Sequence, residues 1–302
     1  MLSFRHEVFF EVAKQLSFSK ASETLFISQP AISKHIKSLE EAYSATLFER
    51  KGNTISLTDS GKILYNHLLK TKEIQKQLEF EISTLNDQSK AKGTLKLGAS
   101  TTVALYIVPS VLSAFHQKHP NVHLNLLNRN SENILKALLE HDIDLGIIEG
   151  KHKITTVKYK HFLTDEVVAV CSTNSELAKV PSLSVKDLKE VPIALRERGS
   201  GTLSAIAYSL KKHKIKISDL NVIIRLGGTE ALKNFILADT SLGFLPLRSV
   251  IKEIANDDLV RVDIPDLKIQ REFYFIRRQG SDGDGLGNAF INFALNHYNL
   301  KL

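Results

Sequence analysis

The chain has 302 residues, of which 43% are hydrophobic, so it is long for one domain and suits a small head followed by one or two larger lobes. Its single cysteine, Cys171, excludes an intramolecular disulfide and a cysteine-based metal cluster, and the lack of a signal-peptide core or a bilayer-length apolar run predicts a soluble, cytoplasmic protein without a membrane partner. The net charge of +7 supports nucleic-acid binding only weakly, because Lys and Arg barely exceed Glu in residues 1–57.

The first forty residues predict three helices. Residues 4–16 carry apolar side chains at helical spacing and form a first helix that packs under the next two. Ser19 and Ser28 are the expected N-caps of the next two helices, and Pro30 falls in a first turn, where its missing N–H costs nothing. A turn at residues 26–28 separates these two helices, whose apolar stripes are Ala21, Leu25, Ile32, Ile36 and Leu39.

The third helix keeps a free face with hydrogen-bond donors and positive charge. Its residues 29–39 include Lys34 and Lys37 and no acid. Gln and Ser can contact base edges in the major groove, while Lys and helix N-terminal N–H groups bind phosphate. From spacing alone, an ordinary helical hairpin with a solvated face remains an equal alternative. The predicted DNA contacts on this helix are Ser28, Gln29, Pro30, Ala31, Ser33, Lys34 and Lys37.

Residues 48–57 predict a tight β-hairpin. Gly52 and Asn53 stand at the turn, between Phe48 and the apolar pair Ile55 and Leu57. Arg50 and Lys51 would then lie beside the duplex backbone, although a solvated basic turn is an equal alternative for Lys51.

Residue identities across this segment resemble the winged helix-turn-helix of LysR-type transcriptional regulators. The chain departs from the family pattern at three positions, with Lys34 where Arg is common, Ser44 where Gly is common and Ser60 where Ala is common. Lysine is a point charge and not a planar fork, so bidentate recognition of guanine is in doubt at Lys34. The matching residues are Phe18-Ser19, Ser28-Gln29-Pro30-Ala31-Ile32-Ser33, Ile36, Leu39-Glu40, Leu47-Phe48, Arg50, Leu57-Thr58 and Gly61.

This resemblance implies a multidomain α and α/β protein that binds promoter DNA and is not an enzyme. The expected parts are an N-terminal winged helix-turn-helix, a long linker helix and a two-lobed α/β effector-binding domain similar to periplasmic solute-binding proteins. The expected partners are double-stranded promoter DNA, a small-molecule effector, RNA polymerase and a second copy of the chain, in a dimer or tetramer. No cofactor, metal ligand or catalytic residue is expected.

A long helix is predicted from Thr58 to about Asp87. Its apolar stripe alternates steps of four and three, which is the period that lets two helices wind around each other. Dimerisation through this helix follows, and packing against the chain's own lobe is the alternative. The stripe consists of Leu64, Leu68, Thr71, Gln75, Leu78, Ile82 and Leu85.

Beyond a polar hinge at residues 89–93, strands alternate with helices over 94–148 and predict a mostly parallel α/β sheet there. Strands are expected at 94–98, 122–127, 144–148, 166–172, 222–226, 242–245 and 271–277, and helices at 103–119, 133–140, 202–213, 230–237 and 286–295. The helix at 103–119 is expected to be broken or kinked around Pro109. The predicted domains are a head over 1–57, a linker helix over 58–88, lobe I over 94–163 and 268–302, and lobe II over 164–267.

Three predicted strand-to-helix junctions carry small hydroxyl or glycine residues, at 100–102, 199–202 and 227–230. Unpaired N–H groups at helix starts and nearby hydroxyls can together bind an anion, and ligands of open α/β folds collect at the carboxyl ends of strands. The alternative is that these Ser and Thr residues are only N-caps. Arg196 and Arg198 flank the second junction, either as cleft ligands or as solvated surface. The predicted effector-binding residues are Ser100, Thr101, Thr102, Gly201, Thr202, Gly228 and Thr229.

No motif supports catalysis or nucleotide binding. The segment at 199–201 lacks the outer glycines of a nucleophile elbow, and no phosphate-binding glycine loop is present. Two hypotheses remain: a LysR-type regulator tuned by a small, anionic effector, and a cytoplasmic enzyme or solute receptor with an accessory helical head. The sequence identifies neither the effector, nor the operator, nor activation against repression.

Overall fold

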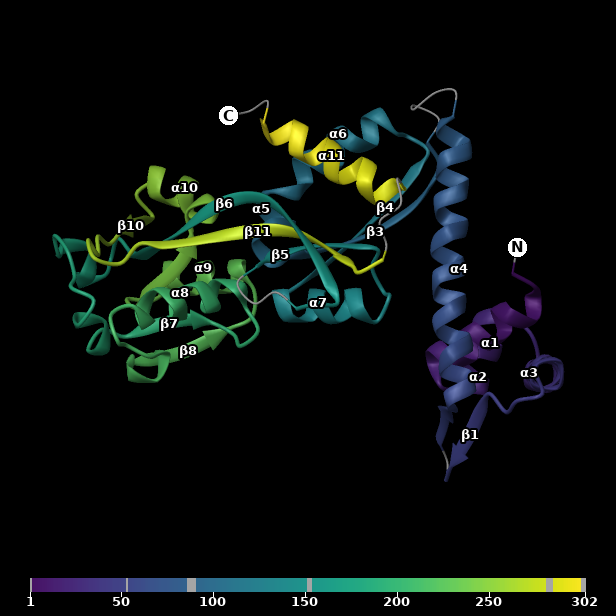
Figure 1. The fold of residues 1–302 in the computed structure, drawn as a ribbon. Coiled ribbons are helices and arrows are strands. Elements are labelled where there is room, and N and C mark those ends of the chain that lie inside the picture. Colours follow the sequence, from purple (N-terminus) through teal and green to yellow (C-terminus); the bar gives the residue numbers. More distant parts are fainter. Residues whose placement is uncertain (1, 53, 86–90, 151–153, 281–284, 300–302) are drawn as a thin grey trace. The chain divides into compact units, whose positions relative to one another are not determined.

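The structure is a computed structural model that describes residues 2–52, 54–85, 91–150, 154–280 and 285–299 (Figure 1). These residues fall into two units, residues 1–82 and 83–302. No helix within the described ranges is both long and apolar enough to cross a membrane.

The smaller unit holds the predicted three helices and hairpin. The apolar stripes of the helices meet in one core with Leu47 of the hairpin stem, and Ile32, Ile36 and Leu39 are buried there as their spacing predicts. Asn53 of the predicted turn lies outside the described residues. The elements are α1 (Phe4–Gln15), α2 (Phe18–Leu25), α3 (Gln29–Tyr43), β1 (Phe48–Lys51) and β2 (Thr54–Leu57), the two strands being antiparallel.

The N-cap of α2 differs from the prediction. Ser17, not Ser19, precedes the helix in extended backbone, and its Oγ accepts a hydrogen bond from the backbone N–H of Lys20 at 3.3 Å. The helix begins one residue earlier than Ser19 because Phe18 packs into the core against the ring of Phe48, with centroids 5.8 Å apart. Ser19 is therefore a residue of the first turn of α2.

Helix α4 (Asp59–Thr84) follows the hairpin and ends a few residues before the predicted end. Thr58 fixes its start as predicted: the Thr58 backbone N–H donates to the Leu47 carbonyl at 3.1 Å, and its Oγ1 accepts from the backbone N–H of Gly61 at 3.0 Å. Residues 86–90, which hold the rest of the predicted linker and part of the predicted hinge, lie outside the described residues.

The predicted stripe of α4 changes its surroundings along the helix. Leu68 is buried against the three-helix core, and Leu64 packs partly against it. Further along, Leu78 and Ile82 are more than half exposed. The second half of α4 therefore presents apolar side chains that the described part of this single chain does not cover.

The larger unit contains one mixed sheet, with strands in the order β4-β3-β5-β11-β6-β9-β7-β8 and β10 paired to β6. The pairs β3–β4, β3–β5, β7–β8 and β7–β9 are parallel, but every pair that involves β6 or β11 is antiparallel. The parallel pairing that the sequence predicts for the strands at 94–148 is confirmed in β3, β4 and β5. The antiparallel strands β6 and β11 carry the chain between the two halves in opposite directions. The strands are β3 (Gly93–Ser100), β4 (Val122–Arg129), β5 (Leu145–Glu149), β6 (Val157–Ser172), β7 (Ile193–Arg196), β8 (Val222–Leu226), β9 (Leu242–Pro246), β10 (Leu259–Arg261) and β11 (Ile269–Arg278).

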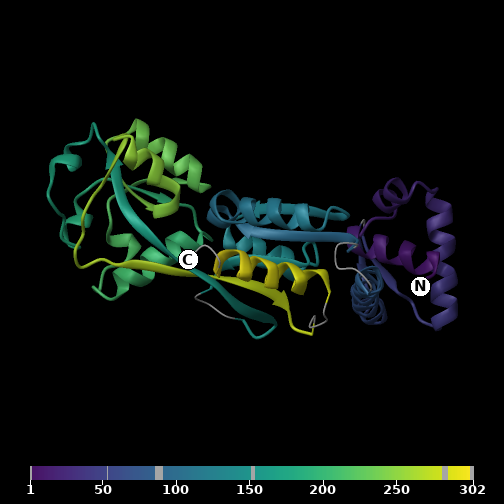
Figure 2. The same ribbon diagram turned by 90° about the horizontal axis from the view of Figure 1, so that it is seen from above.

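Helices cover both faces of this sheet (Figure 2). We use lobe I for β3, β4 and β5 with their helices α5, α6, α7 and α11, and lobe II for β7, β8 and β9 with α8, α9 and α10. Alternate residues of β6 face opposite cores: Val167 and Ala169 pack with α8, whereas Val168 and Val170 pack with α9 and α10. The helices are α5 (Thr101–Tyr106), α6 (Val108–Lys118), α7 (Ser131–Leu139), α8 (Gly201–Lys211), α9 (Thr229–Ala238), α10 (Leu247–Ala255) and α11 (Leu286–Asn299).

The predicted elements of this unit are present, including the predicted break near Pro109, and the described residues add one α-helix and two strands. The predicted helix at 103–119 breaks at Ile107, and Pro109 then sits in the first turn of α6, where it costs no hydrogen bond. The sequence did not predict β7, α10 or β10. Two of these are strands of only three or four residues, and α10 begins immediately after β9 with no loop to mark it.

We predict that Gly61→Ala destabilises the smaller unit by about 1–3 kcal/mol, as overpacking against fixed atoms does. A Cβ at this position would stand 2.1 Å from the carbonyl oxygen of Leu47, which is held in place by its hydrogen bond from Thr58. Chemical unfolding followed by circular dichroism measures the loss. The neighbouring Ser60→Ala, at an exposed position, is the control, and equal stability of the two variants would contradict the proposed close contact.

Candidate functional site

The predicted DNA-contact residues of α3 lie together on its outer face. Ser28, Gln29 and Pro30 are exposed at the start of the helix, and Ser33, Lys34 and Lys37 are exposed further along it, while Ala31 is half-buried. The first turn of α3 contains no acidic residue. Lys37 Nζ lies 4.0 Å from Glu41, on a side chain that is 79% exposed, so this pair holds the lysine only weakly.

A hydrogen bond that the sequence did not predict orients Gln29. Its Nε2 donates to Ser19 Oγ at 2.6 Å, which joins the first turn of α2 to the first turn of α3. The amide oxygen of Gln29 is not used by this bond and remains an acceptor. Ser19 is therefore a positioning residue for Gln29, and its place ten residues before Gln29 offered no local signal for that role.

Two further exposed residues lie in the segments that flank α3 in the chain. Phe26, in the turn between α2 and α3, adopts a left-handed backbone (φ +55°) and is 94% exposed. Arg50 is exposed on β1, whereas the side chain of Lys51 lies outside the described residues. Among the described side chains of the hairpin, Arg50 therefore adds a positive charge to those of Lys34 and Lys37 on α3.

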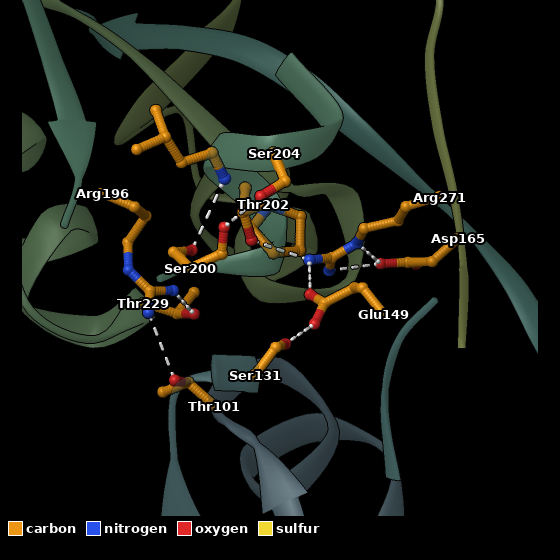
Figure 3. Close-up of polar contacts among 12 residues, drawn as sticks. Thr101, Ser131, Glu149, Asp165, Arg196, Ser200, Thr202, Ser204, Thr229 and Arg271 are labelled. Carbon is orange, nitrogen blue, oxygen red and sulfur yellow. Dashed lines mark hydrogen bonds and ion pairs between the residues drawn. The ribbon is translucent and has the colours of Figure 1, made fainter. Parts of the chain in front are cut away.

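In the larger unit, Arg196 joins the first and third predicted junctions (Figure 3). Its guanidinium is buried, with Nη1 donating to Thr229 Oγ1 at 2.9 Å and Nη2 donating to Thr101 Oγ1 at 3.2 Å. Thr101 belongs to lobe I and Thr229 to lobe II, so this one side chain spans both lobes. Arg198, two residues later, is exposed, so only Arg196 of the two flanking arginines enters the site.

Glu197 neutralises Arg196. Its carboxylate accepts from Arg196 Nε at 2.8 Å and Nη2 at 3.0 Å. Burial alone would raise the pKa of Glu197, but the hydrogen bonds and charge of Arg196 outweigh it and hold that pKa below its ordinary value. Glu197 therefore stays ionised near neutral pH and belongs to the site, although the sequence gave no separate reason to select it.

A second buried arginine, Arg271 of β11, joins the second junction to lobe I and to the central strand β6 (Figure 3). Its Nη1 donates to Thr202 Oγ1 and to Glu149 Oε1, each at 2.8 Å. Its Nε and Nη2 donate to Asp165 Oδ2 at 3.1 and 2.6 Å. Glu149 also accepts a hydrogen bond from Ser131 Oγ. Every charge in this group is paired, which a buried cation requires.

The two lobes are in direct contact at the second junction. A Cβ added to Gly201 would stand 2.3 Å from the carboxylate carbon of Glu149, and the backbone N–H of Glu132 donates to the Gly199 carbonyl at 3.3 Å. Only glycine allows this close approach at position 201. The predicted junctions are therefore brought together, with the hydroxyls of Thr101, Thr202 and Thr229 already bound to arginine side chains of the same chain.

Ser100 differs from the other junction hydroxyls. It precedes α5 as an N-cap in its backbone, but its side chain makes no capping hydrogen bond. Its Oγ is buried and has no hydrogen-bond partner among the described residues. By contrast, Ser200 Oγ accepts from the backbone N–H of Leu203 at 3.5 Å, which is the capping role considered as the alternative. Of these two serines, Ser100 carries an unused hydroxyl and Ser200 does not.

The remaining predicted residues have these places. Thr102 is buried beside Ser100, and Gly228 precedes α9 with a left-handed backbone (φ +89°). Glu230 turns toward Lys233, whose Nζ lies 3.3 Å from it and 2.7 Å from Glu253. Lys233 thereby offsets the negative charge that Glu230 would bring to the third junction.

Comparisons with known proteins match both units of the chain to one family of regulators. Residues 5–62 match the family described as "Bacterial regulatory helix-turn-helix protein, lysR family", and residues 88–299 match "LysR substrate binding domain". The chain is 30% identical over 287 residues to the uncharacterized HTH-type transcriptional regulator YeiE of Escherichia coli strain K12, covering 95% of this chain and 94% of that protein.

Solved structures show the same fold. The regulatory domain of Synechocystis PCC6803 CcmR, solved in complex with 2-PG, is 25% identical with a TM-score of 0.61 and covers 68% of this chain and 97% of that one. Full-length CbnR, solved in complex with its target DNA, is 17% identical with a TM-score of 0.63 and covers 98% and 99% of the two chains.

We predict that Gln29→Ala reduces discrimination between operator and random DNA, because an amide at the start of α3 can reach a base edge and Ala cannot. A loss of about 1–3 kcal/mol in specificity is expected for a good bidentate contact. Ser19→Ala should reduce discrimination in the same direction and to a smaller extent. Fluorescence anisotropy with operator and random-sequence duplexes measures the dissociation constant of each variant for each duplex.

Lys37→Ala is the matched comparison on the same face. It should weaken binding to both duplexes equally and flatten the salt dependence, as the loss of a phosphate contact does. Equal effects of Gln29→Ala on both duplexes would contradict the base-reading role.

Proposed function

Because this chain belongs to the LysR family of bacterial transcriptional regulators, which bind DNA, carry an effector-binding domain and are not enzymes, we propose that a small anionic metabolite between lobes I and II tunes its action on a promoter. The metabolite would alter promoter binding or the activation of RNA polymerase. The observation that carries this proposal is the buried, unpartnered hydroxyl of Ser100 at the end of β3.

The unpartnered hydroxyl supports a ligand for an energetic reason. A buried hydroxyl without a hydrogen bond costs about 1–3 kcal/mol, and a polar ligand group beside Ser100 would remove that cost. Thr102 is buried in the first turn of α5, and Thr101 already reaches across the lobes to Arg196. The ligand site in this proposal comprises Ser100, Thr101, Thr102, Gly201, Thr202, Gly228 and Thr229, together with Arg196.

The anionic character of the ligand rests on Arg196. Its carboxylate partner, Glu197, is adjacent in sequence and partly exposed, with 26% of its side chain accessible. A carboxylate or sulfate of the ligand can replace Glu197 at the guanidinium of Arg196. The displaced Glu197 side chain can then turn toward solvent. Arg271 is less available, because Asp165 and Glu149 hold it and are themselves buried.

We also propose a division of the chain into domains. We assign residues 1–57 to the DNA-binding head, 58–88 to a linker helix, 89–93 to a hinge, 94–163 and 268–302 to lobe I, and 164–267 to lobe II. The boundary at 163/164 falls inside β6, and position 268 immediately precedes β11, the two strands that run between the lobes.

We further propose that the chain assembles with itself, as a dimer or tetramer, through α4. The exposed apolar side chains of Leu78 and Ile82 continue the stripe that Leu64 and Leu68 begin, at the spacing of a coiled coil. A two-fold dimer of the heads would match a pseudo-palindromic operator.

Leu78→Lys is expected to disrupt the dimer and, with it, operator binding. A lysine at a paired core position would bury a charge without a partner, and a single head would hold one half-site poorly. Sedimentation velocity measures the assembly state. Ile63→Lys, at an exposed apolar position of α4 outside the stripe, is the control and should remain dimeric. An unchanged dimer in the Leu78 variant would place the interface elsewhere.

Ser100→Ala is expected to shift the effector dose response of promoter binding to higher concentration by about 5- to 150-fold, since the ligand loses about 1–3 kcal/mol of hydrogen bonding. Binding to DNA without effector should not change, because the hydroxyl has no partner in the free protein. The effector is first selected by thermal shift from a panel of small anionic metabolites.

The matched control for that measurement is Ser241→Ala. Ser241 is also fully buried with an unpartnered Oγ, but it lies between α9 and β9 and outside the predicted junctions. Equal dose responses for wild type and the Ser100 variant would contradict the assignment. Thr202→Val is a less clean test, because Thr202 Oγ1 is an acceptor for the buried Arg271.

A further inference from the structure

A shallow cavity of about 420 Å³ lies where α10 meets the central strands β6 and β11. Leu247, Arg248 and Ile251 of α10 form one wall, because positions three and four apart share a helix face. Residues 164–166 of β6 and Gln270 of β11 form the other wall. No predicted effector residue lines this cavity.

Arg248 presents unused donors to the cavity. Its Nε donates to Asp165 Oδ1 at 3.1 Å, and its side chain is 41% exposed. Neither Nη1 nor Nη2 donates a hydrogen bond to the described residues. A guanidinium held through Nε with both terminal nitrogens available is oriented to receive a carboxylate from the other side.

The acids in the cavity wall are already neutralised. Asp165 Oδ2 accepts from Arg271, and its Oδ1 accepts from Arg248. Glu166 Oε1 accepts from Arg261 Nη2 at 2.8 Å. Because arginines balance the negative charges of Asp165 and Glu166, these carboxylates repel a ligand anion at the Nη atoms of Arg248 less than unpaired carboxylates would.

The other recognition element is apolar. Ile251 is 55% exposed and stands one helical turn after Leu247, so the two side chains offer a continuous apolar surface next to Arg248. Thr164 and Gln270 add polar side chains to the opposite wall. A charged head group and a short apolar body are therefore matched by adjacent parts of one cavity.

We propose that this cavity binds a small monocarboxylate with a short apolar chain, the carboxylate on the Nη atoms of Arg248 and the chain on Leu247 and Ile251. Asp165 is shared between Arg248 and Arg271, so a ligand that draws Arg248 outward changes how tightly Asp165 holds Arg271. Through Arg271 the change reaches Thr202 and Glu149. This coupling to the interlobe site rests on the proposed function, whereas binding itself does not.

The experiment uses the full-length protein and hexanoate as the probe, with hexylammonium as the probe of opposite charge. Isothermal titration calorimetry and ligand-observed NMR measure binding directly, and anisotropy with operator DNA measures the coupling. Wild type should bind hexanoate saturably and ignore hexylammonium. Arg248→Gln and Ile251→Asp should each weaken hexanoate binding at least tenfold, while Ser100→Ala should leave it unchanged.

Ile251→Asp covers the case in which Arg248→Gln unfolds, because Ile251 touches the ligand and not Asp165. Its matched control is Ile223→Asp on β8, an isoleucine of similar exposure outside the cavity, which should bind hexanoate like wild type. Absence of saturable hexanoate binding to wild type, or its survival in Ile251→Asp, overturns the site. Binding without any change in operator affinity overturns the coupling, and failure to bind operator at all is a failure of the proposed function instead.

Discussion

The larger unit depends on the buried guanidinium of Arg271. This side chain is 1% exposed, so its charge must be met entirely by protein groups. Its partners come from β6, β5 and α8, which means that the central strands, lobe I and lobe II all meet at one cation. Any relative movement of the lobes must either carry these partners along or leave a buried charge unpaired, which costs several kcal/mol.

Arg196 imposes a second constraint, but its counter-charge is less buried than those of Arg271. Its hydroxyl partners, Thr101 and Thr229, belong to different lobes, but its counter-charge is the neighbouring and partly exposed Glu197. An exposed carboxylate can be exchanged for another anion at far lower cost than a buried one. Arg271 therefore ties the lobes to the central strands, whereas in the proposed function Arg196 is the arginine that binds the ligand anion.

Much of the fold was predictable because its signals are local. The three-helix head follows from apolar spacing at Ile32, Ile36 and Leu39, and the junction hydroxyls stand beside their own helix starts. Glu149, Asp165 and Arg271 were missed because they meet only after the chain has crossed between lobes twice. One signal was present: Arg271 stands in the same alternation as Ile269, Phe273 and Phe275, so period two alone marks it as buried.

The state of the charges limits how an effector can act. Apart from the Ser100 hydroxyl, the junction side chains that touch across the lobes are already bound to one another, so a ligand gains little by closing the lobes further. It can shift the protein only through interactions that differ between two states. In the proposed function, satisfying Ser100 and replacing Glu197 at Arg196 are two such differences. The second frees Glu197 toward solvent, and Asn130 of lobe I, which already donates to Glu197 at 3.4 Å, is affected by that movement. The effector signal would then begin as a local exchange of anions at one buried arginine.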